Sequence, residues 1–508
     1  MNIVFINPPS VQSDTHDLAP PLWALLLGST ARQAEYDPII LDLGLEVLDK
    51  QAPQHSEEFY SWITEIILEK SPKIVCYTSM GLNGHVSLKI AEHVSCADPS
   101  ILHFFGGPHF SAVAEAVLQH YPWVDAVFLG EAEDTLLKCL RHLRAGQDIS
   151  TLRLPGILTR GNSLRTRERA PVAPDDVPKP AYDLVSLSRY FAVNPRRVLD
   201  FEAGRRGCIF ACRFCYAPEH FGRGERAPSI ARFIQEMAAA AHVGARHLFI
   251  VTDNFVNYPR ETTELCKEIA AAHLGLTFNC YATLAQLTEP VIAALARAGC
   301  TSLYVGVDAV HPEARREFAK GQFRSRHDLL NRIDLCLAHE ITPNLAFLLE
   351  EPEKGKERFV DTVATALAGV IRGCSVAFNT LTVYPRTALA EAREWTFDPC
   401  DLKARICFDA PEVVLQNPYS TQHPELFPFH SSHRSEGTHG KTLMFAHALK
   451  SLAGCAPMAL YEMCERGALL ECLELLLDDI TPAEFAFMPA LKRREIVIET
   501  FLSLCRTR

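Results

Sequence analysis

Two runs of alternating strand-like and helix-like segments constrain this 508-residue chain more than any other feature. In the first run, short apolar stretches alternate with longer segments whose apolar residues recur every three to four positions. Strands that alternate with helices of this length predict an α/β, doubly wound (Rossmann-like) parallel sheet over residues 1–150. The expected strands are residues 3–6, 38–43, 73–78, 101–105 and 126–129, and the expected helices are residues 22–33, 86–95, 112–120 and 133–145.

The second run covers residues 198–392. Its expected strands are residues 198–202, 247–252, 276–281, 302–307, 342–349 and 375–383, separated by helical segments. Six such units predict a partial (β/α)6 TIM barrel, whose active site lies at the C-terminal strand ends. A hairpin-like piece and a proline-dense stretch before it predict a linker over residues 151–197.

Residues 393–508 have a different character. A polar stretch containing His423, His430, His433 and His439 is interpreted as a solvated loop, because these histidines have no acidic or cysteine partners nearby in the sequence. Residues 460–479 and 489–505 then place apolar residues at helical spacing. The sequence therefore predicts a mostly helical C-terminal domain.

Three cysteines follow the first strand of the second run. Cys208, Cys212 and Cys215 form the pattern C-x3-C-x2-C within GRRGCIFACRFCYAPEHFGRG. Three thiolates on one loop can bind three irons of a four-iron cluster and leave the fourth iron open to a small molecule. Zinc, the alternative, ordinarily takes four ligands in paired sets, and the chain has no second such pair. The spacing therefore predicts a catalytic redox cluster.

With these cysteines, the second run resembles the radical S-adenosylmethionine (SAM) superfamily. The resemblance implies that Cys208, Cys212 and Cys215 hold a [4Fe-4S] cluster whose open iron binds SAM. It also implies that Tyr216 packs near the adenine, that Asp253 and Asn254 face the SAM amino group, and that Asp308 lies near the ribose. Two further stretches, Lys320-Gly321 and residues 383–387, match a cobalamin-linked branch, except that Arg386 stands where that branch usually has glycine.

The first run resembles the cobalamin-binding domain that precedes the barrel in this branch. The matching pieces are Asn7-Pro8-Pro9, Pro20-Pro21-Leu22, Gly106-Gly107-Pro108-His109 and Gly130-Glu131-Ala132-Glu133. Each lies at an expected strand end or helix start, where glycine lets the backbone approach a bulky corrin. The resemblance implies that Gly106, Gly107, His109, Gly130 and Glu131 bind cobalamin.

Ser79 and Gly81 lie in the loop of residues 78–82, which we expect to face the lower side of the cobalt. Many corrin proteins supply a lower histidine from a D-x-H-x-x-G motif. Asp14-Thr15-His16 begins a similar stretch, but Ala19 stands at the glycine position and two prolines follow. We interpret this match as a coincidence and expect cobalt without a protein histidine.

Together the two resemblances imply a reaction. An electron from the cluster cleaves SAM, the resulting radical removes hydrogen from the substrate, and methylcobalamin supplies a methyl group. The function expected first is C-methylation of an unactivated carbon in a small metabolite or natural-product intermediate. The alternative is a cyclase, rearrangement or redox enzyme with the same cofactors, because cofactor loops do not report the outcome. A non-catalytic corrin-binding protein is a remote alternative.

Composition limits the classes of partner that we expect for this protein. The chain has 50 Lys and Arg against 61 Asp and Glu, and this net charge of −11 provides no basic footprint for nucleic acid. The first ten residues lack the basic region and the length of a signal peptide, and no uncharged apolar stretch approaches about 18 residues. We expect a cytoplasmic protein with no nucleic-acid partner and no membrane span. Its expected partners are a small-molecule substrate and, by resemblance, an external electron donor of flavodoxin or ferredoxin type.

Overall fold

The computed structural model describes residues 1–9, 18–48, 52–53, 56–160, 171–320, 323–349, 355–392, 394–399, 412–434, 440–478, 495–501 and 503. Its contacts divide the chain into two compact units. Unit 1 comprises Met1–Gly207, Tyr216–His247 and Ala410–Ser431, and unit 2 comprises Cys208–Cys215, Leu248–Asp409 and Ser432–Arg508. The short segment Cys208–Cys215 therefore belongs to unit 2, while the chain on both sides of it belongs to unit 1.

Unit 1 is built on a six-stranded sheet in the order β2-β1-β3-β4-β5-β6. The first five strands are parallel, and β6 pairs with β5 in the antiparallel direction. The first strand of the expected hairpin is thus an edge strand of this sheet, and residues 161–170 lie outside the described residues. The strands are β1 (Asn2–Asn7), β2 (Asp37–Asp42), β3 (Pro72–Thr78), β4 (Leu102–Gly106), β5 (Ala126–Phe128) and β6 (Ile157–Thr159).

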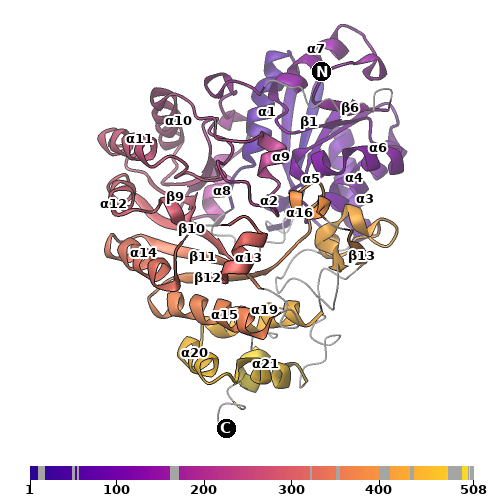
Figure 1. The fold of residues 1–508 in the computed structure, drawn as a ribbon. Helices are drawn as coiled ribbons and strands as arrows, with labels where there is room; N and C mark the ends of the chain where they lie inside the picture. The colour runs from indigo at the N-terminus through magenta and orange to yellow at the C-terminus, as the bar shows by residue number, and fades with distance from the viewer. Residues whose placement is uncertain are drawn as a thin grey trace. The chain divides into compact units, whose positions relative to one another are not determined.

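Helices cover both faces of this sheet, as the doubly wound prediction requires. Among these helices, α1 packs on α7 and α3 packs on α4 (Figure 1). Two helices, α5 and α6, replace the single helix expected over residues 112–120, because the Gly107-Pro108 segment already begins a helix. The helices are α1 (Leu22–Gln33), α2 (Leu43–Leu48), α3 (Ser56–Glu69), α4 (Gly84–Ala97), α5 (Gly107–Ala112), α6 (Ala114–His120), α7 (Glu133–Arg144), α8 (Leu187–Val193), α9 (Ala217–Phe221), α10 (Ile230–His242) and α18 (Glu412–Leu415).

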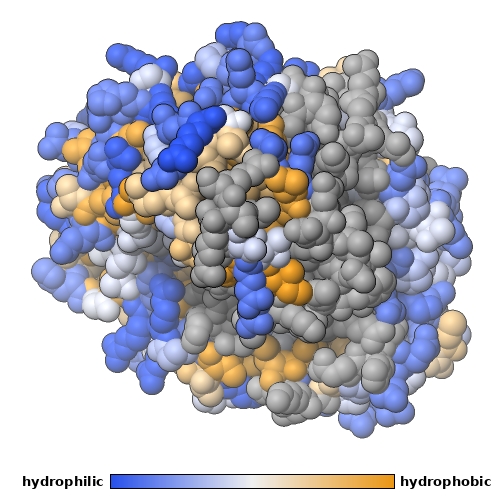
Figure 2. Space-filling view, turned by 90° about the horizontal axis from the view of Figure 1, so that it is seen from below, coloured by the Kyte–Doolittle hydropathy of each residue, from blue (hydrophilic) through white to orange (hydrophobic). Residues whose placement is uncertain are grey.

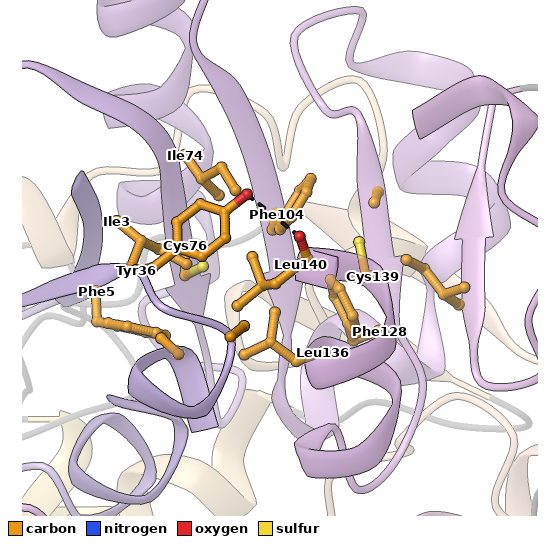
Figure 3. Close-up of a cluster of buried hydrophobic side chains, with 14 of the residues drawn as sticks. Ile3, Phe5, Tyr36, Ile74, Cys76, Phe104, Phe128, Leu136, Cys139 and Leu140 are labelled. Atoms are coloured by element: carbon orange, nitrogen blue, oxygen red, sulfur yellow. Dashed lines mark hydrogen bonds between the residues drawn. The ribbon is translucent and has the colours of Figure 1, made fainter. Parts of the chain in front are cut away.

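The core of unit 1 lies between the sheet and the α1–α7 pair. Phe5 of β1 and Phe104 of β4 point toward the same space as Leu136 and Leu140 of α7 (Figure 3). The Tyr36 hydroxyl donates a hydrogen bond to the Leu140 carbonyl over 3.4 Å. Alternate residues of a strand point to opposite faces, so the neighbouring buried residues of β1 serve the other face. The near-continuous burial of β1 is typical of a parallel sheet covered on both sides.

A second six-stranded sheet has the order β12-β11-β10-β9-β8-β7, and β9 to β12 pair in parallel. This regular order, with helices α12, α14 and α15 packed against its strands, confirms the predicted α/β class. The strands are β7 (Val198–Phe201), β8 (His247–Ile250), β9 (Thr277–Ala282), β10 (Cys300–Asp308), β11 (Thr342–Leu349) and β12 (Ser375–Thr380), and the helices between them are α11 (Pro259–Ala271), α12 (Glu289–Arg297), α13 (Pro312–Glu317), α14 (Arg326–Ala338) and α15 (Lys356–Ile371).

The described part of the C-terminal region is largely helical, as expected. Within unit 2, α19 packs on β12 and α20 packs on α15 (Figure 1). Much of the second expected helical stretch, residues 489–505, lies outside the described residues. The elements are α16 (Ala388–Glu391), β13 (Thr396–Pro399), β14 (Ser431–Arg434), α19 (Gly440–Ala453), α20 (Pro457–Glu465) and α21 (Leu469–Asp478), and β13 pairs with β14.

Hydrophilic residues dominate the described surface in the view of Figure 2, with hydrophobic residues in small groups between them. Among the residues that the structure describes, no helix has both the length and the apolar character needed to span a bilayer.

Candidate cluster and corrin sites

The cysteine loop of unit 2 is held by backbone hydrogen bonds. The Arg213 amide donates to the Phe318 carbonyl over 3.1 Å, and the Leu389 amide donates to the Arg213 carbonyl over 2.8 Å. The Cys215 amide donates to the Cys212 carbonyl over 3.0 Å, which closes a tight turn between these two cysteines. These three hydrogen bonds fix the backbone of the loop at Cys212, Arg213 and Cys215.

All three predicted ligands, Cys208, Cys212 and Cys215, lie outside any disulfide bond and are partly exposed. Burial raises the pKa of Cys208 to about 11. Burial also raises the pKa of Cys212, and the ammonium of Lys320 opposes that shift. Thiols with raised pKa values lose their protons when metal binds, because the metal replaces the proton on sulfur. Partly exposed thiols on one short, anchored loop fit a [4Fe-4S] cluster bound through three cysteines.

Two asparagines position this loop from the side. Asn257 accepts a hydrogen bond from the Ile209 amide over 3.3 Å, and the Asn254 amide nitrogen donates to Asn257 Oδ1 over 2.7 Å. Asn254 also accepts from the Thr283 amide over 3.1 Å, which ties the end of β8 to the end of β9. Asn254 is 1% exposed, and its side chain is engaged by other protein groups. Sequence reasoning missed Asn257, because nothing in its local pattern distinguishes it.

Tyr216 directly follows this loop in the sequence, and Asp253 lies after β8, further along the chain. The carboxylate of Asp253 raises the pKa of Cys208, so the two groups are neighbours in unit 2. Tyr216 directly follows Cys215 and caps the start of α9 in unit 1, where its carbonyl accepts from the His220 amide over 3.0 Å. The Tyr216 ring lies 6.0 Å from the His220 ring, measured between centroids.

Asp308 ends β10 in an unusual backbone conformation. Its φ of 58° is in the left-handed region, and the pairing with β11 shifts register between Gly306 and Asp308. Asp308 Oδ2 lies 2.6 Å from Nζ of Lys320, and both side chains are nearly buried. In the sequence, Lys320 is only part of a stretch that matches the cobalamin-linked branch, and that match predicts no role for it.

In unit 1, the predicted corrin residues gather at the C-terminal ends of β3, β4 and β5. The Ser79 hydroxyl donates to Asn83 Oδ1 over 3.0 Å and accepts from the Gly81 amide over 2.8 Å. The His109 amide donates to the Ser79 carbonyl over 3.1 Å, so the loops after β3 and β4 are joined. Asp14 to Asp17, the stretch interpreted as a coincidental motif, lie outside the described residues.

Glycine is required in the turn after β4. Gly107 has a φ of 83°, and a Cβ on it would lie 2.4 Å from Thr78 Oγ1 and 3.1 Å from the Ser79 carbonyl oxygen. Gly106 precedes it in extended backbone, as the residue before the first turn of α5. His109 is fully buried, and burial lowers its pKa to about 3, so its ring is neutral at neutral pH. The bare backbone of this turn fits the close approach of a large flat ligand.

The turn after β5 is packed just as tightly. Gly130 has a φ of 64°, and a Cβ on it would lie 2.7 Å from the His220 carbonyl oxygen of α9. The Gly130 amide donates to the Ser111 hydroxyl over 3.0 Å. This turn therefore brings the backbone of α9 and the end of α5 together within unit 1.

Glu131 belongs to a buried ionic network. Its Oε1 accepts from Arg206 over 2.9 Å and from Arg226 over 2.8 Å. Arg206 also bonds Glu133 over 2.6 Å and Glu202 over 2.5 Å. Arg206 lies two residues before Cys208, so this network fixes the chain at its entry to the cysteine loop. Arg206 lies 75 positions from Glu131 and 73 from Glu133, so no local pattern in the sequence links these pairs.

A C-terminal segment completes unit 1. His430 hydrogen-bonds the Leu82 carbonyl over 2.9 Å, and His85 hydrogen-bonds the Val413 carbonyl over 3.1 Å. The His85 and His430 rings pack edge to face with centroids 4.5 Å apart. His430 is 1% exposed, which corrects the solvated-loop interpretation for this residue. The segment covers the start of α4, directly after the Ser79–Gly81 loop, and so reaches the predicted corrin edge.

Comparison with known proteins identifies two families, one after the other along the chain. Residues 11–140 match the B12 binding domain family, and residues 205–361 match the Radical SAM superfamily. An uncharacterized methyltransferase of Pyrococcus horikoshii is 26% identical over 335 residues, which cover 63% of this chain and 68% of the relative. An anaerobic magnesium-protoporphyrin IX monomethyl ester cyclase of Rubrivivax gelatinosus is 23% identical over 322 residues, 61% of this chain and 56% of the relative. The chain thus spans little more than half of that cyclase.

A solved structure shares the fold. The radical SAM methyltransferase TsrM from Kitasatospora setae, with cobalamin and a [4Fe-4S] cluster bound, superposes with a TM-score of 0.62 over 93% of this chain and 99% of TsrM. The sequence identity is 16%, so the similarity concerns the fold alone.

Proposed function

Since this chain is a cobalamin-dependent radical SAM enzyme, with a B12-binding domain ahead of a radical SAM domain, we propose that it methylates an unactivated carbon of a small metabolite or natural-product substrate. Its cofactors are a [4Fe-4S] cluster, SAM and cobalamin. When bound, the cluster and SAM supply a radical that activates carbon, and the corrin supplies a methyl group. The pairing of these two domains carries the proposal, and similarity to named methyltransferases supports it.

On the radical SAM side, Cys208, Cys212 and Cys215 bind the cluster. Asn257 and the Asn254 side chain hold the loop in place through the Ile209 amide. Asp253, which lies near Cys208, is assigned to the SAM amino group. Tyr216 and Asp308 complete the proposed set, toward the adenine and the ribose respectively.

On the corrin side, Ser79, Gly81, Gly106, Gly107, His109, Gly130 and Glu131 form the proposed set. The two glycine turns are packed against neighbouring protein atoms, which leave no room for a side chain. We assign their backbone to the edge that the macrocycle contacts. The Glu131 carboxylate is already bound by Arg206 and Arg226, so we assign it to holding the loop after β5 rather than to a charge on the corrin. The neutral ring of His109 adds no charge to the site.

The proposal also includes the domain boundaries, the location and the partners of the protein. We propose domains at residues 1–150, 151–197, 198–392 and 393–508. We also propose a cytoplasmic location, no nucleic-acid partner, and an electron donor of flavodoxin or ferredoxin type. The radical chemistry needs one electron from outside the protein, which is the reason for such a donor.

A second function, cyclisation or rearrangement without methyl transfer, follows from one observation. The relative from Rubrivivax gelatinosus is named a cyclase, and its similarity extends over 61% of this chain. The two functions differ in products, because methyl transfer consumes a second SAM to restore the methyl group and releases S-adenosylhomocysteine.

Anaerobically reconstituted protein with hydroxocobalamin, reductant and methyl-deuterated SAM provides the test. We expect 5′-deoxyadenosine, more than one S-adenosylhomocysteine per protein, and labelled methyl groups on a compound from a metabolite extract, all by mass spectrometry. Cys212→Ala should abolish deoxyadenosine and retain corrin, while Cys455→Ala, which changes an exposed cysteine elsewhere in unit 2, should alter neither. Deoxyadenosine with unlabelled products and no S-adenosylhomocysteine turnover would contradict methylation and favour the cyclase alternative.

A further inference from the structure

A buried lysine lies against the cysteine loop. Lys320 is 8% exposed, and its ammonium nitrogen is 2.6 Å from Asp308 Oδ2. The same ammonium acts electrostatically on the thiols of Cys212 and Cys215, so it lies near both sulfurs. It also lies 5.9 Å from the centroid of the Phe214 ring, between those two cysteines in the sequence. One positive charge thus faces a carboxylate on one side and two predicted cluster ligands on the other.

Four features of the backbone place this lysine and its partner Asp308. The register shift at the end of β10 and the left-handed backbone of Asp308 bring its carboxylate to the lysine. Gly306 leaves the space open, because a Cβ there would lie 3.1 Å from Asp308 Oδ2 and 3.3 Å from Lys320 Nζ. The Lys320 amide donates to the Arg315 carbonyl over 2.7 Å, which fixes the base of the side chain. A left-handed aspartate is strained, so the pair persists only because surrounding structure imposes it.

An ordinary structural ion pair would account for the position of the ammonium beside Asp308. It would not account for its position near the sulfur of Cys212. A buried ammonium needs a partner to offset its desolvation, and Asp308 alone provides one. The proximity to Cys212 is additional, and it places a donor with three N–H groups near a predicted metal ligand. Hydrogen bonds and positive charge at cluster sulfurs stabilise the reduced cluster, which carries one more negative charge.

We propose that Lys320 is a positioning residue of the cluster, which donates to the sulfur of Cys212 and makes the cluster easier to reduce by one electron from the external donor. Asp308 holds the lysine side chain in place. Its negative charge also partly offsets the effect of the ammonium on the reduction potential of the cluster. The inference rests on the proposed assignment of Cys208, Cys212 and Cys215 as cluster ligands, and it adds a determinant of reduction that no cysteine provides.

The test is a potentiometric titration of the reconstituted holoenzyme without SAM, followed by the paramagnetic resonance signal of the reduced cluster. Lys320→Met keeps a long side chain and removes the charge. We expect its midpoint potential to fall by about 59 mV, a tenfold change in a one-electron equilibrium. Lys320→Arg should retain most of the native potential. Arg213→Met is the matched control, since it removes a partly exposed charge from the cysteine loop itself and should shift the potential much less.

Iron and sulfide analysis separates this inference from the proposed function. A Cys212→Ala protein that still holds the full cluster would overturn the cysteine assignment. A fully loaded Lys320→Met protein at the native potential would overturn the lysine inference alone, and weaker SAM binding at that potential would assign the lysine to SAM instead. If Lys320→Met fails to fold, Lys320→Gln decides, because it removes the charge and keeps a polar side chain. Its potential should also fall, and a native potential would overturn the inference.

Discussion

At the scale of single residues, burial separates charges that matter from charges that do not. Arg206 faces three carboxylates and is almost fully buried, whereas the helical pair Lys138–Asp134 is about half exposed. The cysteine spacing could be predicted because it is contained in eight residues. Arg206, Asn257 and Lys320 could not, because each acquires its role from partners far along the chain.

Replacing Arg206 should be costly. Arg206→Met leaves Glu131, Glu133 and Glu202 buried with less compensation, and we expect the free energy of unfolding to fall by about 3–5 kcal/mol. Urea unfolding of the cofactor-free protein measures it. Lys138→Met removes an exposed partner and should change the same quantity by less than about 1 kcal/mol. Equal effects of the two substitutions would contradict a structural role for the buried network.

Buried histidines should make unit 1 sensitive to mild acid. Burial lowers the pKa of His103 to about 4, whereas an unfolded histidine titrates near 6.5. Between these values the unfolded chain binds a proton that the folded chain excludes, so stability falls as pH falls. We expect His103 to contribute about 1.4 kcal/mol of this loss per pH unit below roughly 6.5. His103→Phe should reduce the slope of unfolding free energy between pH 6 and about 5 by that amount, and an unchanged slope would contradict the assignment.

At the scale of elements, buried parallel strands were the most predictable part of the fold. The segment of residues 342–349 is β11 as expected, because a short apolar run, Leu345–Leu349, ends at two glutamates and indicates a strand. The start of α5 was not predictable, since Gly-Gly-Pro is typical of a turn and here also begins a helix. The three-residue β6 at the sheet edge was too short for its pattern to distinguish it from a hairpin.

The turn after β4 offers a test at this scale. Gly107→Ala adds left-handed strain and a collision with Thr78, and we expect a loss of about 3 kcal/mol in unfolding free energy together with weaker corrin retention. Gly146→Ala is the matched control, because Gly146 is also left-handed but has nothing within 4 Å of the added Cβ. It should cost about 1 kcal/mol and leave corrin retention unchanged, as measured by absorbance after desalting. Equal corrin loss in both proteins would exclude a specific role for the β4 turn.

At the scale of the whole molecule, unit 1 is assembled from three separate stretches of chain. The hydrogen bond from His430 to Leu82 joins residues 348 positions apart, and that between His85 and Val413 joins residues 328 positions apart. Local periodicity reports neighbours within one element, so no pattern in the sequence indicates which unit a distant loop will join. The order of domains was therefore accessible from the sequence, while this long-range closure was not.

Removing a contact between the C-terminal segment and α4 should destabilise unit 1 locally. His430→Ala removes a buried ring and its bond to Leu82, and we expect faster hydrogen exchange in peptides of α4 and the Ser79–Gly81 loop. Peptides of β11 and α14 in unit 2 should exchange at the native rate. His423 provides the control, because this partly buried ring packs on His120 at the end of α6. His423→Ala should therefore leave α4 unchanged. Uniformly faster exchange in both units would indicate global destabilisation and contradict a local role.

The interrupted course of unit 1 also has a consequence during synthesis. Its last stretch ends at Ser431, so the ribosome has joined 431 of 508 residues before every part of this unit exists. At about 5–20 residues per second, roughly 10–40 s separate the appearance of Gly207 from that of Ala410. For that interval the nascent α4 lacks the partners that later cover it. Completion of the amino-terminal half of this enzyme therefore depends on the translation of its carboxyl-terminal part.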